Sequence, residues 1–293
     1  MAALATSGIT LPKNIAAGMW SKAVTGSTVA ALSGAEPMQF GDVDIMTFEL
    51  PPRAEYVGEG ADKGPTPVGF NSKTVKPHKV QVTMRFNQEV QWADEDYQLG
   101  VLSTLSDAGA VALARALDLG VYHAINPLSG ATVATITETV TDTLNRVEMA
   151  NAADQEVESA AGLVILKGFT PNGVALDPLY AWTLATARYT DGRKKFPDLG
   201  FGTNITQFEG LNASVSNTVS GTPEAADTGV RAIIGDFRTI RWGVQRRVPV
   251  ELIQFGDPDG LGDLKRKNQI ALRLEAVYGL SLIHISEPTR PER

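Results

Sequence analysis

The 293-residue chain contains no cysteine and only three histidines, His78, His123 and His284. The missing cysteines exclude disulfides, thiolate metal sites and cysteine nucleophiles. The histidines are scattered along the chain, so they do not form a zinc or catalytic cluster. The sequence also lacks the phosphate-binding pattern G-x-x-x-x-G-K-[ST], the metalloprotease pattern H-E-x-x-H and the hydrolase pattern G-x-S-x-G. These absences argue against an enzyme and predict no cofactor and no metal site.

Long apolar runs and excess positive charge are also absent. No stretch reaches membrane-spanning length, and the N-terminal residues MAALATSGITLPKN have neither the charged nor the apolar region of a signal peptide. The net charge of -7 argues against tight nucleic-acid binding over the whole surface, because such binding requires Lys and Arg to neutralise phosphates. The last third nevertheless holds a group of cations: Arg238, Arg241, Arg246, Arg247, Lys265, Arg266 and Lys267. Such a face is usually solvated, but in an assembly it suits an acidic neighbour or a phosphate.

The longest segment with a single secondary-structure pattern is helical. Acidic residues at 94–96 suit a helix N-terminus. One buried face is then predicted by apolar residues at helical spacing, namely Val101, Leu102, Leu105, Ala108, Ala112, Leu113 and Ala116. A helix from Asp94 to Ile125 would be about 48 Å long. Gly109 weakens its middle by about 0.5–1 kcal/mol relative to alanine, and Gly120 is a candidate C-cap. We interpret the segment as a spine, although a long core helix of any mixed domain has the same pattern.

Two runs alternate between apolar and polar residues, which is typical of half-buried strands. They cover residues 46–50 and 80–86. Residues 51–79 between them are rich in glycine and proline, and so long a link without its own core is unusual inside a compact domain. We expect the two strands to pair as a hairpin that forms the base of a projecting loop. An unstructured surface insertion is the alternative.

The rest of the chain predicts a mixed α+β fold without a strict βαβ repeat. Residues 131–140 predict a strand, residues 143–159 have helical spacing, and the apolar run 162–167 predicts a buried strand. Asp177 followed by Pro178 predicts an N-cap and the first position of a helix through residue 188. A turn is expected at 170–173, a loop at 188–202, and further strands at 211–215, 230–234, 248–255 and 269–278.

One acidic stretch imitates a calcium-binding loop. Asp257, Asp259 and Gly262 occupy loop positions one, three and six. Position five is Leu261 and position twelve is Asn268, where calcium requires an oxygen ligand and a bidentate glutamate. We therefore interpret the stretch as a turn.

The C-terminal segment Ser281 to Arg293, SLIHISEPTRPER, resembles the peptide that appears when a sequencing adapter is translated at the end of a truncated read. We expect residues 281–293 to be non-native, with the natural C-terminus missing, and exclude them from the fold prediction.

Three local motifs resemble one known family. They are GVALDPLYAWTLATARYTDGRKKFP (Gly173 to Pro197), GDF (Gly235 to Phe237) and DLKRKNQIALRLEAVYGL (Asp263 to Leu280). An arm, a projecting hairpin, a spine helix and a mixed α/β region occur in the order found in that family. From about Phe40 to Leu280, the chain resembles the major capsid protein of tailed bacteriophages, which has the Hong Kong 97-like shell fold.

The resemblance implies how the chain is divided. Residues 1–40 would form an N-terminal arm and residues 41–90 an extended β-hairpin loop, both embracing neighbouring subunits. Residues 91–130 and 246–280 would form the peripheral domain with the spine helix, and residues 131–245 the axial domain. Many members carry a scaffolding domain before the arm, for which this chain has no room.

The resemblance also implies function and partners. The chain would be a non-enzymatic virion protein that self-assembles, as hexamers and pentamers, into an icosahedral head around double-stranded DNA in the host cytoplasm. Its partners would be other copies, a separate scaffolding protein, a portal, optionally a decoration protein, and packaged DNA through non-specific contact, without a membrane. An encapsulin-like nanocompartment subunit is the alternative within this fold. An enzyme or a calcium-dependent binding module is the alternative of another class.

Some family members form an isopeptide bond between a loop lysine and an asparagine of another subunit, aided by a glutamate. Matching motifs place these groups at Lys63, Asn268 and Glu275. A carboxylate of raised pKa would take the amine proton, and the neutral amine would attack the carboxamide and release ammonia. Asn268 and Glu275 would be about 23 Å apart on one extended strand, so only several subunits could bring the three groups together. Other candidates for the lysine lie nearby, at Lys73, Lys76 and Lys79, and a solvated surface position is the alternative for each.

Overall fold

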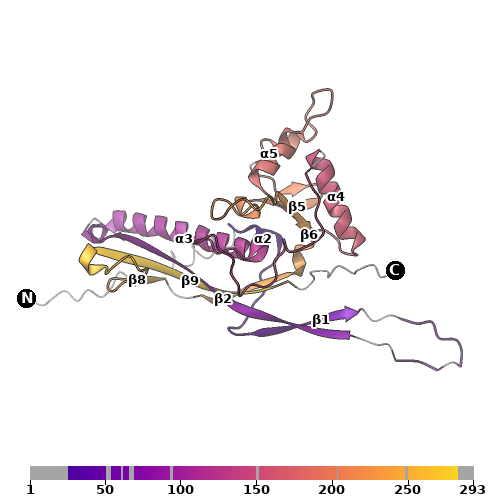
Figure 1. The fold of residues 1–293 in the computed structure, drawn as a ribbon, viewed down its shortest axis with the longest axis horizontal. Coiled ribbons are helices and arrows are strands. Elements are labelled where there is room, and N and C mark those ends of the chain that lie inside the picture. The colour runs from indigo at the N-terminus through magenta and orange to yellow at the C-terminus, as the bar shows by residue number, and fades with distance from the viewer. Residues whose placement is uncertain are drawn as a thin grey trace, which may run out of the picture.

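The computed structural model has a long lower layer, an upright lobe and a hairpin that projects sideways (Figure 1). It describes residues 26–50, 54–60, 62–65, 69–92, 95–149, 152–202, 204–247 and 250–282. Residues 1–25 of the expected arm and residues 283–293 of the expected tail lie outside the described residues. Among the helices that are described, none has both the length and the apolar character needed to cross a bilayer.

The lower layer contains an antiparallel sheet in the order β1-β2-β9-β7, with β8 also paired to β9. Its strands are β1 (Val43–Leu50), β2 (Gly69–Asn87), β7 (Ile240–Arg247), β8 (Glu251–Ile253) and β9 (Gln269–Leu282). The long strand β2 changes partner along its length. Its first part pairs with β1 up to Val75, and from Lys76 onward it pairs with β9.

This register corrects the predicted hairpin. Residues 80–86 pair with β9, whereas β1 pairs with residues 69–75, which the sequence analysis had placed in the link. The connecting loop is therefore residues 51–68. Residues 69–75 lack a clear apolar alternation because this part of β2 projects beyond the core, so neither face needs a continuous apolar row.

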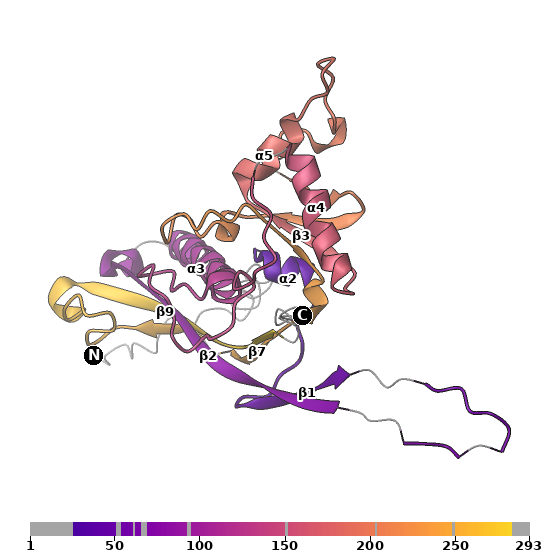
Figure 2. The same cartoon turned by 45° about the vertical axis from the view of Figure 1, so that its right-hand side comes forward.

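The predicted spine is helix α3 (Glu95–His123), which lies along the sheet above β2 and β9 (Figures 1 and 2). A short helix, α2 (Thr28–Leu32), packs beside it. Leu113 and Leu117 of α3 share a core with Leu274 of β9. The buried face differs from the predicted one near the middle, since Ala108 is exposed and Ala110 is buried.

Glycine at position 109 has a packing reason. A Cβ atom on Gly109 would lie 2.7 Å from Leu274 Cδ2 and 3.3 Å from Met84 Cε. Gly109 lowers the helix propensity of α3, and its missing side chain lets the helix approach the sheet closely.

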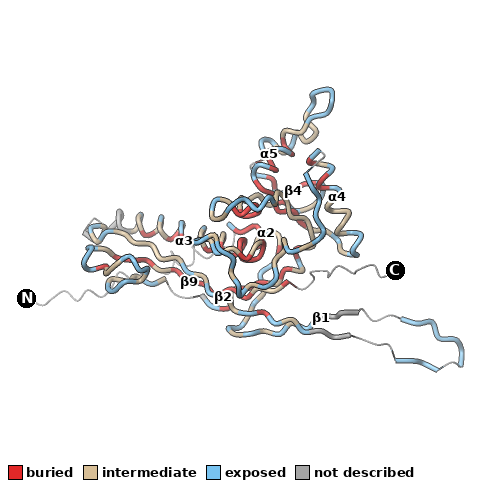
Figure 3. Tube along the Cα trace, in the orientation of Figure 1, coloured by how far each residue is buried: buried red, intermediate tan, exposed pale blue. Residues whose placement is uncertain are grey.

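The upright lobe is built on a second sheet in the order β4-β5-β3-β6. Its elements are β3 (Gly173–Leu176), β4 (Gln207–Phe208), β5 (Leu211–Val215), β6 (Ala232–Gly235), α4 (Ala153–Leu166) and α5 (Pro178–Thr186). Alternate residues of β3 face two cores. Val174 packs in the cluster that contains Leu184 of α5, whereas Ala175 packs in the cluster that contains Val29 of α2. The lobe is thus joined to the lower layer through shared core packing, and Figure 3 shows the buried residues concentrated there.

Two predicted strands are wrong. Residues 131–140 form turns with one isolated bridge between Ile125 and Thr132. The segment instead folds back on the end of α3, where the Val140 N–H donates to the Val121 carbonyl at 3.0 Å. The apolar run 162–167 belongs mostly to α4, with Leu166 82% exposed. A short apolar run fits a helix and a strand equally well, and here residues 162–164 are only half-buried while residues 165–167 are exposed.

Other predictions agree more closely with the structure. The Asp177 carboxylate accepts a hydrogen bond from the Leu179 N–H at 2.9 Å, which caps α5 as expected, although the helix ends at Thr186. Strand β5 has its predicted bounds. Helix α4 begins only at Ala153. Among the described residues 250–255 of the expected strand 248–255, only Glu251–Ile253 form a strand, β8. Strands β3, β4 and β7 were not predicted.

Strand β9 continues past its predicted end. Ser281 and Leu282 pair with Arg241 and Ile240 of β7, and Leu282 is buried. The sheet therefore extends two residues into the segment 281–293, whose non-native origin stays a prediction.

Candidate functional site

The loop between β1 and β2 presents exposed side chains away from the body of the molecule (Figure 1). All of its described residues, 54–60 and 62–65, are exposed, Lys63 among them. Tyr56 is fully exposed to solvent, because no other part of the described chain covers it. Glu55 accepts a hydrogen bond from the Gly64 N–H at 3.3 Å, which joins the two sides of the loop.

Asn268 lies at the junction between the 3-10 turn η5 (Lys265–Lys267) and β9. It adopts the left-handed conformation with φ 55°, and its exposed side chain donates through Nδ2 to Glu89 Oε1 at 3.3 Å. Asparagine tolerates this conformation better than most residues, so its identity has a local structural reason as well.

Glu275 lies farther along β9, opposite Gln81 of β2. Its carboxylate is 3.0 Å from Lys79 Nζ, and its side chain is only 14% exposed. The predicted site residues are therefore not brought together in one chain. Figures 1 and 2 place the β1–β2 loop and the β8–β9 connection at opposite ends of the molecule.

A buried carboxylate that the sequence analysis missed connects three segments. Asp118 of α3 is fully buried and accepts hydrogen bonds from the hydroxyls of Ser27, Thr28 and Thr218 at 2.5, 2.8 and 2.9 Å. It also accepts from the N–H groups of Thr28 and Val29 at 3.0 and 3.1 Å. Burial raises the pKa of Asp118, while these hydrogen bonds act in the opposite direction. An aspartate among apolar residues on the helix was the one available signal.

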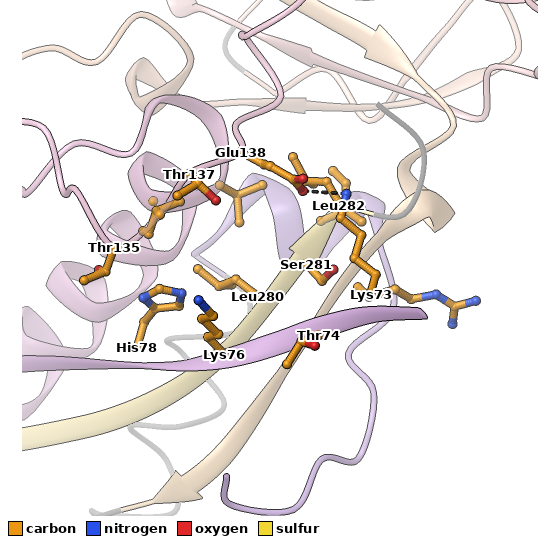
Figure 4. A pocket seen from close by; sticks show the side chains of 15 residues that line it. Lys73, Thr74, Lys76, His78, Thr135, Thr137, Glu138, Leu280, Ser281 and Leu282 are labelled. Atoms are coloured by element: carbon orange, nitrogen blue, oxygen red, sulfur yellow. Dashed lines mark ion pairs between the residues drawn. The ribbon is translucent and has the colours of Figure 1, made fainter. Parts of the chain in front are cut away.

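A cavity of about 190 Å³ lies beside the base of the hairpin (Figure 4). Lys73 of β2 forms an ion pair with Glu138 at 2.5 Å, which ties the hairpin to the segment after α3. His78 and Lys76 line the same cavity. Burial and then the charge of Lys76 lower the pKa of His78. The cavity is therefore a junction between the base of the hairpin and the segment after α3.

The calcium-like stretch binds a guanidinium group. Arg85 of β2 donates to Asp257 at 2.9 Å and to both carboxylate oxygens of Asp259. This agrees with its interpretation as a turn, because Arg85 occupies the carboxylates that a cation would need. Within the described ranges, no group of three or more His, Asp or Glu side chains is arranged to hold a metal ion.

Comparison with solved structures identifies the family. The chain is similar to a structure from Mycobacterium phage Ogopogo, with 48% identity over 88% of this chain and 89% of that chain and a TM-score of 0.78. A structure from Gordonia phage Cozz is 29% identical over 88% and 83% of the two chains, with a TM-score of 0.75. The chain belongs to the major capsid protein family of tailed bacteriophages.

A likeness in fold alone extends further. The capsid of an empty GTA particle, computed with C5 symmetry, matches this capsid protein at 13% identity and a TM-score of 0.58, over 88% of this chain and 87% of that one. Neither protein-family models nor curated proteins give a match. The capsid protein is a subunit of a phage head shell, and its neighbours favour this function over an encapsulin-like compartment.

Proposed function

We propose that this capsid protein builds an icosahedral head of hexamers and pentamers that encloses double-stranded DNA. The observation that carries the proposal is the β1–β2 loop, whose described residues are all exposed and which has no core of its own. Such a loop gains stable packing only against another molecule, and the chain belongs to a family whose members form shells. The net charge of -7 suits a shell that encloses DNA without binding it tightly.

The proposal includes a role for each part of the chain. The arm (1–40) and the loop (41–90) contact neighbouring copies, although α2 of the arm packs within its own subunit. Residues 91–130 and 246–280 form the peripheral domain, and residues 131–245 form the axial domain. A separate scaffolding protein, a portal and a decoration protein are the proposed partners, and assembly takes place in the host cytoplasm. Binding between copies, without catalysis, is the proposed activity.

Electron microscopy of the purified protein tests this proposal. Residues 1–282 should be expressed, because Leu282 completes β9, and imaged with and without the candidate scaffolding protein. We expect closed particles of uniform diameter, or capsomer rings. A chain that stays monomeric at high concentration with scaffolding protein present would contradict the proposal.

We also propose that Lys63 of one subunit forms an isopeptide bond with Asn268 of another. The exposure of both side chains supports this, and so does their location in segments at opposite ends of the molecule, which excludes a bond within one chain. The amine nitrogen bonds to the carboxamide carbon and ammonia leaves, with Glu275 of a further subunit accepting the amine proton.

A boiled denaturing gel of mature particles tests the bond. Wild-type particles should give a ladder of covalent multimers that Lys63→Arg and Asn268→Ala both abolish. Lys76→Arg is the matched control, because Lys76 is another exposed lysine of the hairpin, and it should keep the ladder. If wild-type particles run only as monomer, the isopeptide-bond proposal is wrong, while the proposed shell function is unaffected.

A further inference from the structure

The cavity at the base of the hairpin collects positive charge from two separate strands. Lys73 and Lys76 of β2 line it together with Arg241 of β7. Among the described residues of its lining, the one carboxylate is that of Glu138, which forms an ion pair with Lys73. Three cations and one anion give the lining a positive formal charge. This space, here called the basic cavity, therefore suits an anionic ligand.

Lys76 is the cation of this cavity that lacks an internal counter-charge. Its side chain is exposed, and across the part of the chain that the structure describes no ion pair joins it to a carboxylate. The neighbouring lysines differ, because Lys73 and Lys79 each pair with a glutamate. Lys76 and His78 are two residues apart on β2 and so share one face of the strand, where Figure 4 shows them side by side. An anion beside Lys76 would therefore also lie close to His78.

Arg241 contributes a buried donor group to the lining. Its Nη1 contacts the carboxylate of Glu36, but its Nε is buried and has no hydrogen-bond partner among the described residues. A buried N–H without an acceptor destabilises a fold, and an oxygen of a bound anion would satisfy it. The Ser281 hydroxyl is also buried without a partner there. Because residue 281 belongs to the segment predicted to be non-native, Ser281 is left out of the candidate site.

The size and polarity of the basic cavity fit a tetrahedral anion. Its volume of about 190 Å³ is several times the roughly 30 Å³ that one water molecule occupies in the liquid. Thr135 and Thr137 also line it (Figure 4), and each hydroxyl can donate to an anionic oxygen. A phosphate group presents several oxygens in different directions. It can therefore accept from an ammonium, a guanidinium and hydroxyl groups at the same time.

We propose that the basic cavity binds a phosphate group, with Lys76 and Arg241 as its main donors. The bound group would connect the base of the hairpin on β2 with β7, and would so add to the ion pair of Lys73 and Glu138 that already holds the hairpin. The phosphate belongs either to a small free anion or to the backbone of packaged DNA, and the experiments below separate these two sources. Binding of a small anion does not depend on the shell function proposed above.

His78 reports whether the basic cavity is occupied. Burial and then the positive charge of Lys76 lower the pKa of its imidazole. The charged groups that line the cavity with it are Lys73 and Lys76 of β2, Arg241 of β7 and Glu138, whereas the lining residues of α3 and β9 are uncharged. A bound anion offsets the positive charge and so raises the pKa of His78. By linkage, anion affinity should rise as pH falls through this pKa, because protonated His78 attracts the anion.

Nuclear magnetic resonance of the unassembled full-length chain measures this pKa. The signal missing from His78→Gln assigns His78, and His123 is the internal reference because it does not line the cavity. Sulfate is the first probe, since it is a tetrahedral anion whose charge stays constant during the titration, and chloride at equal ionic strength is its control. Sulfate should raise the pKa of His78 by about 0.5–1 above its value in chloride and leave that of His123 unchanged. Equal pKa values of His78 in the two salts would overturn the proposal.

Lys76→Gln separates binding in the cavity from general screening of charge. Pyrophosphate affinity, measured by isothermal titration calorimetry, should fall by about tenfold or more because a charged donor is lost. In this variant the pKa of His78 should start higher in chloride than in wild type, and sulfate should no longer raise it. Lys79→Gln is the matched control, because Lys79 is another exposed lysine of β2 but lies outside the lining, and it should bind like wild type. Equal pyrophosphate affinity of Lys76→Gln and wild type, or no saturable binding by wild type, would show that the site is wrong.

A short DNA duplex of mixed sequence distinguishes the two sources of phosphate. If the duplex raises the pKa of His78 in wild type but not in a chain that carries Lys76→Gln when the histidine is titrated, the cavity binds backbone phosphates of DNA. If pyrophosphate has this effect and the duplex does not, the ligand is a small free anion. A response to both probes that persists in Lys76→Gln would overturn the proposed site.

Discussion

Ser27 and Asp118 lie 91 positions apart in the chain, and the Ser27 hydroxyl donates a 2.5 Å hydrogen bond to the Asp118 carboxylate. The same carboxylate accepts from Thr218, which belongs to the 3-10 turn η3 (Asn217–Val219). One side chain of the spine helix thus fixes the start of α2 and a segment of the lobe. The first described helix is therefore held in place by a residue of α3.

Replacing Asp118 should destabilise the unassembled subunit. Asp118→Ala leaves three hydroxyls and two N–H groups without their buried acceptor, so we expect a loss of about 2–4 kcal/mol in the free energy of unfolding. Denaturant unfolding measures it. Ser106→Ala is the matched control on the same helix, because the Ser106 hydroxyl is buried without a hydrogen-bond partner among the described residues. An equal loss in both variants would show that Asp118 has no special role.

Asp118 should also give the subunit a specific pH dependence. Burial raises its folded-state pKa above the usual 3.8, so the folded state binds the proton more tightly than the unfolded state. The resulting stability is complete below the unfolded pKa and is lost as pH rises through the raised folded pKa. The free energy of unfolding of wild type should therefore fall relative to Asp118→Asn with rising pH. Parallel pH profiles of the two proteins would contradict this.

Gly243 should tolerate no side chain. It lies opposite Gly279 in the β7–β9 pair, and a Cβ at position 243 would collide with the carbonyl oxygen of Glu36. Gly243→Ala should displace the segment around Glu36 and reduce stability by about 1–3 kcal/mol. Hydrogen exchange of the Glu36 N–H, which donates to the Trp242 carbonyl at 2.9 Å, reports the displacement. Gly235→Ala is the control, because a Cβ there meets nothing within 4 Å.

Two glycines of α3 should respond differently to alanine. Gly100→Ala meets nothing within 4 Å and should stabilise the subunit by about 0.5–1 kcal/mol, because alanine is the better helix former. Gly109→Ala places its Cβ against the buried Leu274, so overpacking should cancel or exceed that gain. Thermal unfolding of both variants checks the difference. A rise in melting temperature for Gly109→Ala as large as that for Gly100→Ala would contradict the close-packing argument.

Arg85 should hold the 257–263 turn in place. Its hydrogen bond lowers the pKa of Asp259, so the interaction stabilises the fold above the unfolded pKa and is lost as pH falls through the lowered folded value. Arg85→Lys cannot bind both carboxylates in a planar fork. We expect faster hydrogen exchange at the Leu261 and Gly262 N–H groups, which donate to Asp259 and Asp257. Arg238→Lys, at an exposed arginine that pairs with the half-buried Asp236, should leave that exchange unchanged.

Local chemistry made several elements predictable. Asp177 followed by Pro178 specifies a helix start through capping and a fixed φ, and the structure confirms it. The helical spacing of residues 101–116 identified α3 because it extends over several turns. Strand β5 was found at its exact bounds, although a run this short often is not.

The incorrect predictions concern segments whose structure depends on the elements that pack against them. The run 162–167 is apolar, but α4 leaves Ile165 and Leu166 exposed, which fits a surface awaiting a partner better than a core strand. The change of pairing partner along β2 could not be predicted from the sequence. An alternating pattern shows which face of a strand is buried but not which strand lies beside it. The candidate lysine, asparagine and glutamate came from the resemblance alone, and their joint action stays a prediction.

By itself the sequence determined the spine helix, the projecting loop between two strands, the helix cap at Asp177 and the absence of thiol chemistry, because each depends on residues close together in the chain. Only the tertiary structure decided that Asp118 meets Ser27 and that Arg85 meets Asp259. It also placed the β1–β2 loop and the β8–β9 connection at opposite ends of the molecule. The two contacts depend on packing between segments 91 and 174 positions apart, which no local pattern encodes.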